Sequence, residues 1–503
     1  TRLGLGAFTA SAIAALAAGL VFALDGAALT VALALAALAT AFASTRLNVP
    51  VLRWSVAAIG VALASRLAWN PRIVGAALSP TPIFNWLLFG YGAPALAFGL
   101  AARLMRRGGE DIPVRVADAL AILFSAFLFF FEIRHLTNHG DPFARGSGLI
   151  EQALLAISSV GFAIVLIRLD AARANVVFLW ASLGAGVLGM ACAAIGLLLV
   201  YNPFLDSRPV KGGLFLNALV LGYLLPGALA GLLAIFARGR RPLWYWGGAA
   251  ALAMLMAFSY GALELRLLFH GPAIGWDEGF TLSELGLDVA SCLVLTLLAI
   301  LAGSGPRATT AARAFFIASA AVAVLGLAAF GNPLFTDEPI AGGVAINALL
   351  VAYALPGLLT LALARLERAL SSRAIGSAAN FSAILWFFAY ATLETRRVFQ
   401  GAAIGIDRGA GNGEWYAYSA VWLALGLALL GYGVWRGFRE ARWASAFFIF
   451  ATTLKVFLFD LAGLEGFLRA LSFLGLGAAL IGIGLIYQKW VFVRPAPEAA
   501  PGA

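Results

Sequence analysis

Charged residues are scarce in this chain of 503 residues. They make up 12% of it, whereas a soluble domain contains about 25%. Hydrophobic residues make up 62%, and the mean hydropathy is +0.94. Apolar runs recur along the whole chain at the length that crosses a hydrocarbon core of roughly 30 Å. The composition therefore excludes a soluble globular protein and predicts an all-α, polytopic membrane protein.

Cysteine and histidine are also rare, with two Cys and three His residues. Cys192 and Cys292 lie in apolar runs without metal-ligand spacing, so we expect both to be core residues. His135 and His139 have a spacing that can bind metal, but no third ligand lies nearby in the sequence. We expect no metal and no cofactor. The absence of a phosphate-binding loop also argues against ATP-driven transport by this chain alone.

The apolar segments predict about 16 transmembrane helices. Their ranges are 4–24, 28–44, 51–69, 86–105, 116–136, 149–169, 179–201, 218–237, 244–269, 281–303, 314–331, 348–367, 380–400, 415–435, 443–462 and 466–490. We expect the Pro- and Ala-rich tail, 491–503, to be disordered. Because the chain begins with Thr1 rather than Met, we also expect a trimmed N-terminus.

The net charge of +10 arises from an uneven distribution of Arg and Lys between the loops. Of the 34 basic residues, 22 lie on the side of the two visible termini. The opposite side holds five, which are Arg72, Arg145, Arg208, Lys211 and Arg408. The positive-inside bias predicts a bacterial inner membrane protein with both visible termini in the cytoplasm. We therefore expect the lipid bilayer, and no nucleic acid, as its partner.

One polar pattern occurs three times. An Asn-Pro pair is followed by a second Asn, a Tyr, a Pro and a Glu-x-Arg, and each position shifts by 132 and then by 130 residues between copies. Self-similarity at a fixed period predicts repeated architecture. We expect three parallel four-helix repeats at 51–169, 179–303 and 314–435, flanked by helix pairs at 1–50 and 443–490.

The recurring residues fall at the outer ends of the predicted helices, so they predict a polar layer at the outer membrane face. We expect Arg134, Arg266 and Arg396 to pair with the Glu that opens the next helix, and the Glu of each Glu-x-Arg to face the Asn and Tyr. His270 aligns with His139 and Gln400, which favours a hydrogen-bonding role. The candidate binding residues are Asn85, Tyr91, Glu132, Arg134, Glu151, Asn217, Tyr223, Glu264, Arg266, His270, Glu284, Asn347, Tyr353, Glu394, Arg396 and Glu414.

Several segments resemble a known group of bacterial membrane proteins. They are LELRLLFHG (263–271), LETRRVFQG (393–401), EWYAYSAVWLALGLALLGYG (414–433) and, most specifically, LKVFLFDLAGLEGFLRALSFLGLGAALIGIGLIYQKW (454–490). These are similar to the predicted membrane proteins called "domain of unknown function 2339", whose members tend to be longer at the N-terminus. The resemblance implies a multi-pass membrane protein and assigns no activity. Its last segment also places Lys455, Asp460, Glu465 and Arg469 near one end of a hairpin, where they pair or extend the polar layer.

Three function classes fit this sequence. Transport, or binding of a small molecule or lipid in the cell envelope, comes first, because prolines 94, 226 and 356 interrupt spans and ionisable residues lie within spans. A structural scaffold or partner subunit comes second, with the polar layer locking helices together. A membrane enzyme acting on a lipid-linked envelope substrate comes third, with Glu132 and Glu151 as candidate acid and base. The sequence does not determine the oligomeric state.

Overall fold

The computed structural model describes residues 2–47, 49–70, 72–73, 81–301, 305–370, 373–437, 439–460 and 466–490. These residues are almost entirely helices and loops, and the strand-like pairing among them is two isolated bridges. The chain divides into two compact units, Thr1–Glu278 and Gly279–Ala503. The predicted disordered tail, Pro71 and Glu465 lie outside the described residues.

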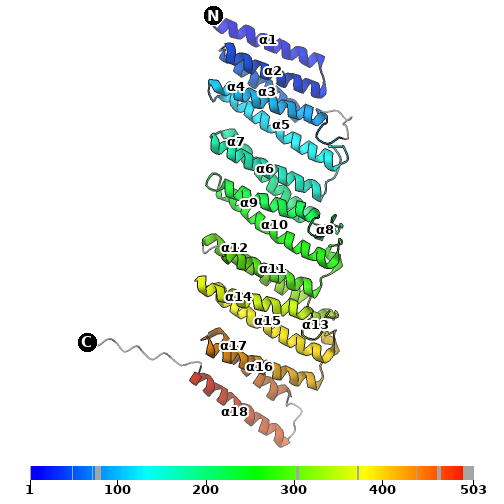
Figure 1. Cartoon of the computed structure of the whole chain (residues 1–503), viewed down its shortest axis with the longest axis vertical. Coiled ribbons are helices and arrows are strands. Elements are labelled where there is room, and N and C mark those ends of the chain that lie inside the picture. The colour runs from blue at the N-terminus through cyan, green and yellow to red at the C-terminus, as the bar shows by residue number, and fades with distance from the viewer. Residues whose placement is uncertain are drawn as a thin grey trace, which may run out of the picture. The chain divides into compact units, whose positions relative to one another are not determined.

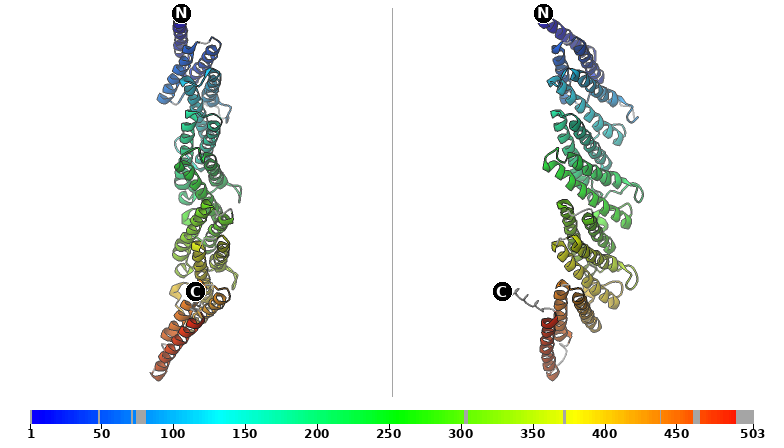
Figure 2. Two further views of the ribbon diagram at one scale, coloured as in Figure 1. Left: turned by 90° about the vertical axis from the view of Figure 1, so that its left-hand side faces the viewer. Right: turned by 60° about the vertical axis from the view of Figure 1, so that its left-hand side comes forward.

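In the first unit, long helices follow one another along the chain (Figure 1). Their bounds are α1 Arg2–Ala23, α2 Gly26–Leu47, α3 Pro50–Trp69, α4 Ala93–Met105, α5 Ile112–Thr137, α6 Leu149–Ala172, α7 Val176–Ala191, α9 Leu225–Ala237 and α10 Leu243–His270, with the four-residue α8 at Pro203–Asp206. Neighbours in sequence also pack together, as α6 does with α7 and α9 with α10 (Figure 2).

The second unit is built in the same way. Its helices are α11 Leu282–Leu301, α12 Pro306–Val322, α14 Leu355–Leu370, α15 Arg373–Gln400, α16 Asn412–Trp435, α17 Arg439–Lys455 and α18 Gly466–Trp490, with the four-residue α13 at Pro333–Thr336. Every one of the 16 predicted spans thus coincides with one long helix, which confirms the predicted fold class.

Twelve of these helices, among the described residues, are long and apolar enough to cross a membrane. The apolar parts of three others are shorter, at Phe8–Ala23, Leu350–Leu366 and Phe473–Leu485. The remaining predicted span, 380–400, lies in α15, which has 28 residues but is interrupted by polar side chains such as Asn380 and Thr392.

The three prolines that we expected to break helices do not do so. The turns just before them are π-helical, at η1 Leu88–Gly92, η4 Val220–Leu224 and η7 Leu350–Ala354, and the helix then continues with proline in its first turn. A proline lacks the N–H of the usual backbone bond and clashes with the preceding turn. Widening that turn by one residue accommodates the ring and keeps the helix intact.

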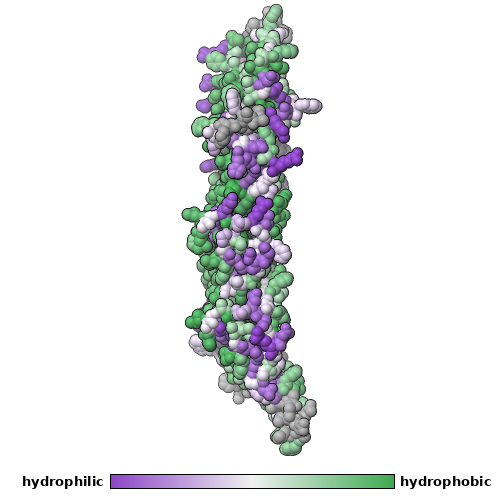
Figure 3. Space-filling model, turned by 90° about the vertical axis from the view of Figure 1, so that its right-hand side faces the viewer, coloured by the Kyte–Doolittle hydropathy of each residue, from purple (hydrophilic) through white to green (hydrophobic). Residues whose placement is uncertain are grey.

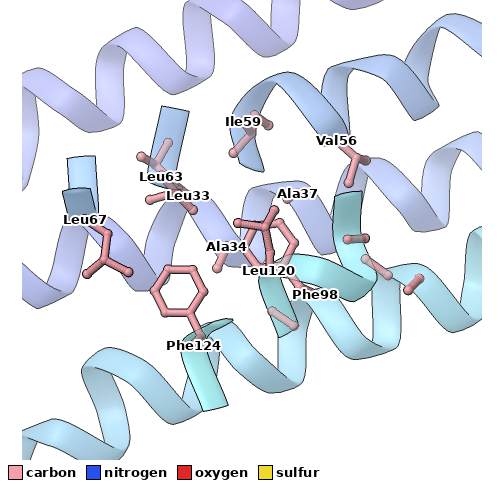
Figure 4. Close-up of a cluster of buried hydrophobic side chains, with 14 of the residues drawn as sticks. Leu33, Ala34, Ala37, Val56, Ile59, Leu63, Leu67, Phe98, Leu120 and Phe124 are labelled. Atoms are coloured by element: carbon pink, nitrogen blue, oxygen red, sulfur yellow. The ribbon is translucent and has the colours of Figure 1, made fainter. Parts of the chain in front are cut away.

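One of the hydrophobic clusters of the first unit lies between α2, α3, α4 and α5 (Figure 4). Phe98 and Phe124 are fully buried there, with ring centroids 6.1 Å apart. A Cβ at Gly60 would meet Leu120 Cδ1 at 2.3 Å, so the glycine leaves room for the Leu120 side chain between α3 and α5. Because lipid is as apolar as the core, such close packing of small residues supplies much of the attraction between membrane helices.

Within each unit, hydrophilic side chains gather on one side, which is the side of α8 in the first unit and of α13 in the second (Figure 3). In the first unit, this side carries the ends of α5 and α10 and the starts of α6 and α9. It holds the recurring polar residues of the first predicted repeats and is called the polar end below.

Candidate functional site

The second Asn of each predicted repeat begins a helix. The Oδ1 atoms of Asn85, Asn217 and Asn347 accept hydrogen bonds from backbone N–H groups two residues later, at 2.7, 2.8 and 2.8 Å. An Asn in this position satisfies an N–H that has no partner within the helix. The residue is therefore required locally by the start of the helix.

The same three Asn side chains also join two helices. Their amide nitrogens donate to the Glu of Glu-x-Arg, at 3.1 Å for Glu132, 2.8 Å for Glu264 and 2.9 Å for Glu394. This confirms the predicted approach of Glu and Asn. Each Asn side chain is thus occupied at both its oxygen and its nitrogen, and it ties the start of one helix to the end of the next.

The prediction that these Glu side chains also face the tyrosines is wrong for two of them. Tyr223 donates instead to the carbonyl oxygen of Leu197 at 2.7 Å, and Tyr353 donates to that of Leu327 at 3.3 Å. Tyr91 is fully buried, and its ring centroid lies 5.2 Å from that of Phe131. The carbonyl groups of Leu197 and Leu327 belong to the π-helices η3 Cys192–Val200 and η6 Ala323–Phe330, whose wide turns leave carbonyl oxygens available as acceptors.

The Arg of each Glu-x-Arg binds the loop that follows its helix. Arg266 donates through Nε to Ile274 O at 2.8 Å and through Nη2 to Gly275 O at 2.5 Å. Arg396 makes the matching bonds to Ile404 O and Gly405 O, at 2.6 and 2.5 Å. The planar guanidinium holds the loop backbone at two points.

The third branch of this guanidinium reaches the next helix. Arg134 pairs with Glu151 at 2.7 Å, and Arg396 pairs with Glu414 at 2.9 Å. Both predicted ion pairs are confirmed, and both carboxylates are buried, with side-chain exposures of 3% and 1%. Glu284 accepts a bond from the Thr281 N–H at 3.3 Å, and its pairing with Arg266 stays a prediction.

We expected the position of His270 to form a hydrogen bond, and Gln400, the matching residue of the third predicted repeat, does so. Gln400 Nε2 donates to Glu414 Oε2 at 2.6 Å. In the first repeat, Asn138, and not His139, donates to Glu151, at 2.9 Å. His270 itself is half-buried at the end of α10. Among the described residues, no three His, Cys, Asp or Glu side chains form a group that could hold a metal ion.

A polar pocket of about 430 Å³ opens at the polar end of the first unit. Its walls are the loop before α6, the first turn of α6, and the loop around α8. Three of the five basic residues that the sequence assigned to the outer side line it, namely Arg145, Arg208 and Lys211. The predicted site residue Glu151 also contributes to the wall.

The charges in this polar pocket do not balance locally. Glu151 already has Arg134 as its partner, and Asp206 pairs with Arg208 at 3.0 Å. Arg145 and Lys211 are exposed and form no ion pair within the part of the chain that the structure describes. Two cations without acidic partners therefore border one hollow, and this arrangement attracts an anion.

Two further polar clusters contain no residue of the polar pocket. At the opposite end of the helices, Asp118 accepts from Arg106 at 2.5 Å and from Asn175 at 2.9 Å, and Asp170 pairs with Arg241 at 2.9 Å. Sequence reasoning missed this network, although an Asp within the apolar run 116–136 was a signal for it. These contacts join α5 to the end of α4 and the start of α7, and they join α6 to the loop before α10.

The second cluster lies near the end of α17. Lys455 donates to Asp460 Oδ1 at 2.8 Å, to Ser419 Oγ at 2.7 Å and to the Trp415 carbonyl at 2.9 Å. This confirms pairing for the first two charges of the predicted hairpin quartet. Glu465 and the Arg469 side chain lie outside the described residues. The Lys455 charge is satisfied by three oxygens, so this cluster locks α16 to α17.

The model of one protein family, described as "Predicted membrane protein (DUF2339)", matches residues 1–328 and 277–490. These ranges cover nearly the whole chain. No curated protein and no solved structure matches it.

Proposed function

Because the chain belongs to this family of predicted membrane proteins, we propose that it is an integral membrane protein that binds an anionic small molecule or lipid headgroup in the polar pocket. The observation that carries the proposal is the presence of Arg145 and Lys211 at one hollow of about 430 Å³ without acidic partners among the described residues. The charge bias of the loops supports an orientation with this pocket outside and the visible termini in the cytoplasm of a bacterial inner membrane.

The distribution of charge favours binding over transport. In α6, no charged residue occurs between Glu151 and Arg168, and α9 contains none at all. A path for an ion or polar solute through the middle of the bilayer needs polar groups that replace water. The helices that border the polar pocket lack such polar groups at that depth, so we expect the ligand to bind in the pocket without crossing the membrane.

A structural scaffold is the second candidate. It is favoured by the contacts of the recurring Asn, Glu and Arg residues, which satisfy helix starts, loops and one another. Membrane catalysis has less support. Glu151, one of its two candidate groups, is held by Arg134, Thr137 and Asn138 at 2.7, 3.2 and 2.9 Å and has little freedom to exchange a proton with a substrate.

Binding of a soluble anion to the purified protein tests the proposal. The protein is placed in zwitterionic lipid nanodiscs and titrated with glycerol 3-phosphate by calorimetry, and the double variant Arg145→Gln, Lys211→Gln is compared with the wild type. We expect the variant to bind at least tenfold more weakly. The control, Arg173→Gln with Arg240→Gln, removes two exposed charges at the opposite helix ends and leaves binding unchanged.

Two outcomes would contradict anion binding at the polar pocket. One is a wild-type protein that binds neither glycerol 3-phosphate nor an anionic lipid. The other is an equal loss of binding in both double variants, because this would reflect net charge and not a site. Either result favours the scaffold.

A further inference from the structure

A second hollow lies on the same helices as the polar pocket. It has a volume of about 570 Å³ and is bordered by α5, α6 and α7, with Phe129, Leu155, Phe162, Trp180 and Leu188 among its walls. No charged residue lines it. We call it the apolar groove.

The apolar groove is open to the surroundings of the protein. Trp180 is 67% exposed, Leu188 57% and Phe129 53%. Water would not cover such a surface without a large cost, whereas hydrocarbon does so readily. In a chain that spans the membrane, the groove is therefore filled by an apolar chain.

The polar pocket and the apolar groove lie end to end on shared elements. On α6, Glu151 borders the pocket and Leu155 borders the groove, a separation of about 6 Å along the helix. On α5, Thr137 borders the pocket, and the groove begins about 10 Å further along at Phe130. A molecule with a short linker between its polar and apolar parts spans this gap.

The length of the apolar groove suits one acyl chain. Along α5 it extends from Phe130 to Ala119, which corresponds to about 16 Å of helix. Along α7 and the start of η3 it extends from Cys192 to Val176, the first residue of α7, which corresponds to about 24 Å. The groove thus begins near the pocket and follows most of a hydrocarbon core of roughly 30 Å, which is long enough for one extended acyl chain.

We propose that the two hollows form one binding site for an anionic glycerophospholipid, with the headgroup phosphate between Arg145 and Lys211 and an acyl chain in the apolar groove. This rests on the proposed function, since it identifies the class of anion that the polar pocket takes. The cations provide selectivity for charge, and the groove provides the additional affinity of a long chain over a soluble headgroup.

Filling the apolar groove tests this assignment. A Cβ added at Gly184, which lines the groove on α7, meets nothing within 4 Å, so Gly184→Phe occupies the groove without straining the helix. Gly248→Phe on α10 is the matched control, because Gly248 also has open space around a Cβ and does not line the groove. Each variant is titrated with dioleoyl phosphatidylglycerol, dioleoyl phosphatidylcholine and glycerol 3-phosphate, with native mass spectrometry as the readout for the lipids.

We expect the wild type to bind the phosphatidylglycerol at least tenfold more tightly than the phosphatidylcholine. Gly184→Phe abolishes this preference and retains weak binding of glycerol 3-phosphate, whereas Gly248→Phe changes neither. Equal binding of the two lipids would mean surrounding lipid only and would overturn the proposal. If Gly184→Phe fails to fold, phosphatidylglycerol with brominated acyl chains serves as the probe, because bromine quenches tryptophan fluorescence. An acyl chain in the groove quenches Trp180, so the wild type should show quenching that Trp180→Phe lacks.

The outcomes separate the two proposals. Glycerol 3-phosphate binding that depends on Arg145 and Lys211, together with no effect of Gly184→Phe and no Trp180 quenching, overturns the lipid assignment and leaves the proposed function intact. Absence of binding that depends on Arg145 and Lys211, for soluble anion and lipid alike, overturns both.

Discussion

Two loops of this protein, 201–217 in the first unit and 331–347 in the second, share a backbone and differ in charge. Each contains an Asn that caps a four-residue helix, accepting an N–H bond at 3.0 Å in both cases. Each then has a residue in the left-handed region, Ser207 or Asp337, with φ of 51°. An isolated bridge closes each loop, from Gly212 to Asn217 and from Gly342 to Asn347.

The side chains on these two backbones diverge. Arg208 and Lys211 of the first loop correspond to Glu338 and Ala341 of the second. Ser207 Oγ donates to Asp277 at 2.7 Å, whereas at the matching place Asp337 accepts from Arg408 at 2.8 Å. The recurring residues therefore build the loop, and the varying residues decide which charge it presents. The residues that differ between the two loops are therefore the better candidates for a function.

The largest effect is expected from removing the Arg of Glu-x-Arg, which is Arg266 in the first unit and Arg396 in the second. Arg266→Ala and Arg396→Ala should each destabilise the folded protein, by about 3–5 kcal/mol for Arg396, because Glu414 is then left buried without its partner. Thermal unfolding of detergent-purified protein, followed by circular dichroism, measures this. Arg→Lys at both positions keeps the charge but not the two-point hold on the loop, and should recover part of the loss.

A similar loss of stability at the two positions would support a common structural role. An Arg266→Ala protein as stable as the wild type would break the comparison, since the bonds to Ile274 O and Gly275 O would then contribute nothing to the fold.

The Asn at the start of the second helix should have a smaller effect that is equal in both units. Asn217→Ala and Asn347→Ala lose a helix cap and a bond to Glu264 or Glu394, which corresponds to about 1–2 kcal/mol. Asn→Asp preserves the cap but places a second carboxylate beside the Glu, so it should destabilise more than a cap change alone. Thermal unfolding midpoints of the four variants decide this, and unequal midpoints for the matched pairs would count against a shared scaffold.

Charge exchange should separate function from fold. Lys211→Ala copies the residue of the second loop into the first, and we expect glycerol 3-phosphate to bind about fivefold more weakly, equivalent to about 1 kcal/mol. The unfolding midpoint should stay within error, because Lys211 is exposed and forms no ion pair among the described residues. Ala341→Lys is the reciprocal control and should leave anion binding at the polar pocket unchanged. A drop in stability in Lys211→Ala would instead assign this residue to the fold.

The smallest effect is the response of the second loop to acid. The Arg408 guanidinium and the Gly405 N–H hold the pKa of the Asp337 carboxyl at about 2, below its ordinary value of 3.8. A carboxyl whose pKa is lowered by folding stabilises the folded state above its unfolded pKa and loses that contribution as pH falls through the folded pKa. The contribution of Asp337 is thus present above pH 4 and is lost toward pH 2.

Because Asp337 is exposed, solvent screening keeps this contribution small. The difference in unfolding midpoint between wild type and Asp337→Asn should shrink as pH is lowered from 5 to 2. The difference in unfolding midpoint between wild type and Ser207→Ala should show no such dependence on pH near pH 2. A constant difference for Asp337→Asn would indicate that the pair with Arg408 does not control this loop.

Much of the fold could be predicted because the bilayer imposes it. Apolar segments of the required length became helices at all 16 predicted positions, since backbone groups in a membrane must find partners within their own segment. The pairs Arg134–Glu151 and Asn85–Glu132 were also predictable, because both members occupy the same end of adjacent helices. Position along a helix is enough for such contacts.

The partners of the tyrosines could not be predicted in this way. Tyr223 lies in a π-helical turn, which rotates the following residues away from the direction that an α-helix gives them. The hydroxyl then meets a carbonyl of another π-helical segment. Both features depend on backbone irregularities that spacing in the sequence does not reveal.

The sequence by itself determined the membrane class, the order of the helices and the polar end at which the recurring residues lie. These follow from composition and from position along each helix, which are local properties. Only the tertiary structure brought Arg145 near Lys211, although α6, α7, η3 and α8 lie between them in the sequence, and placed an apolar groove next to their pocket. That juxtaposition depends on how α5, α6 and α7 pack, which decides which two cations share a hollow and which face of each helix is left open.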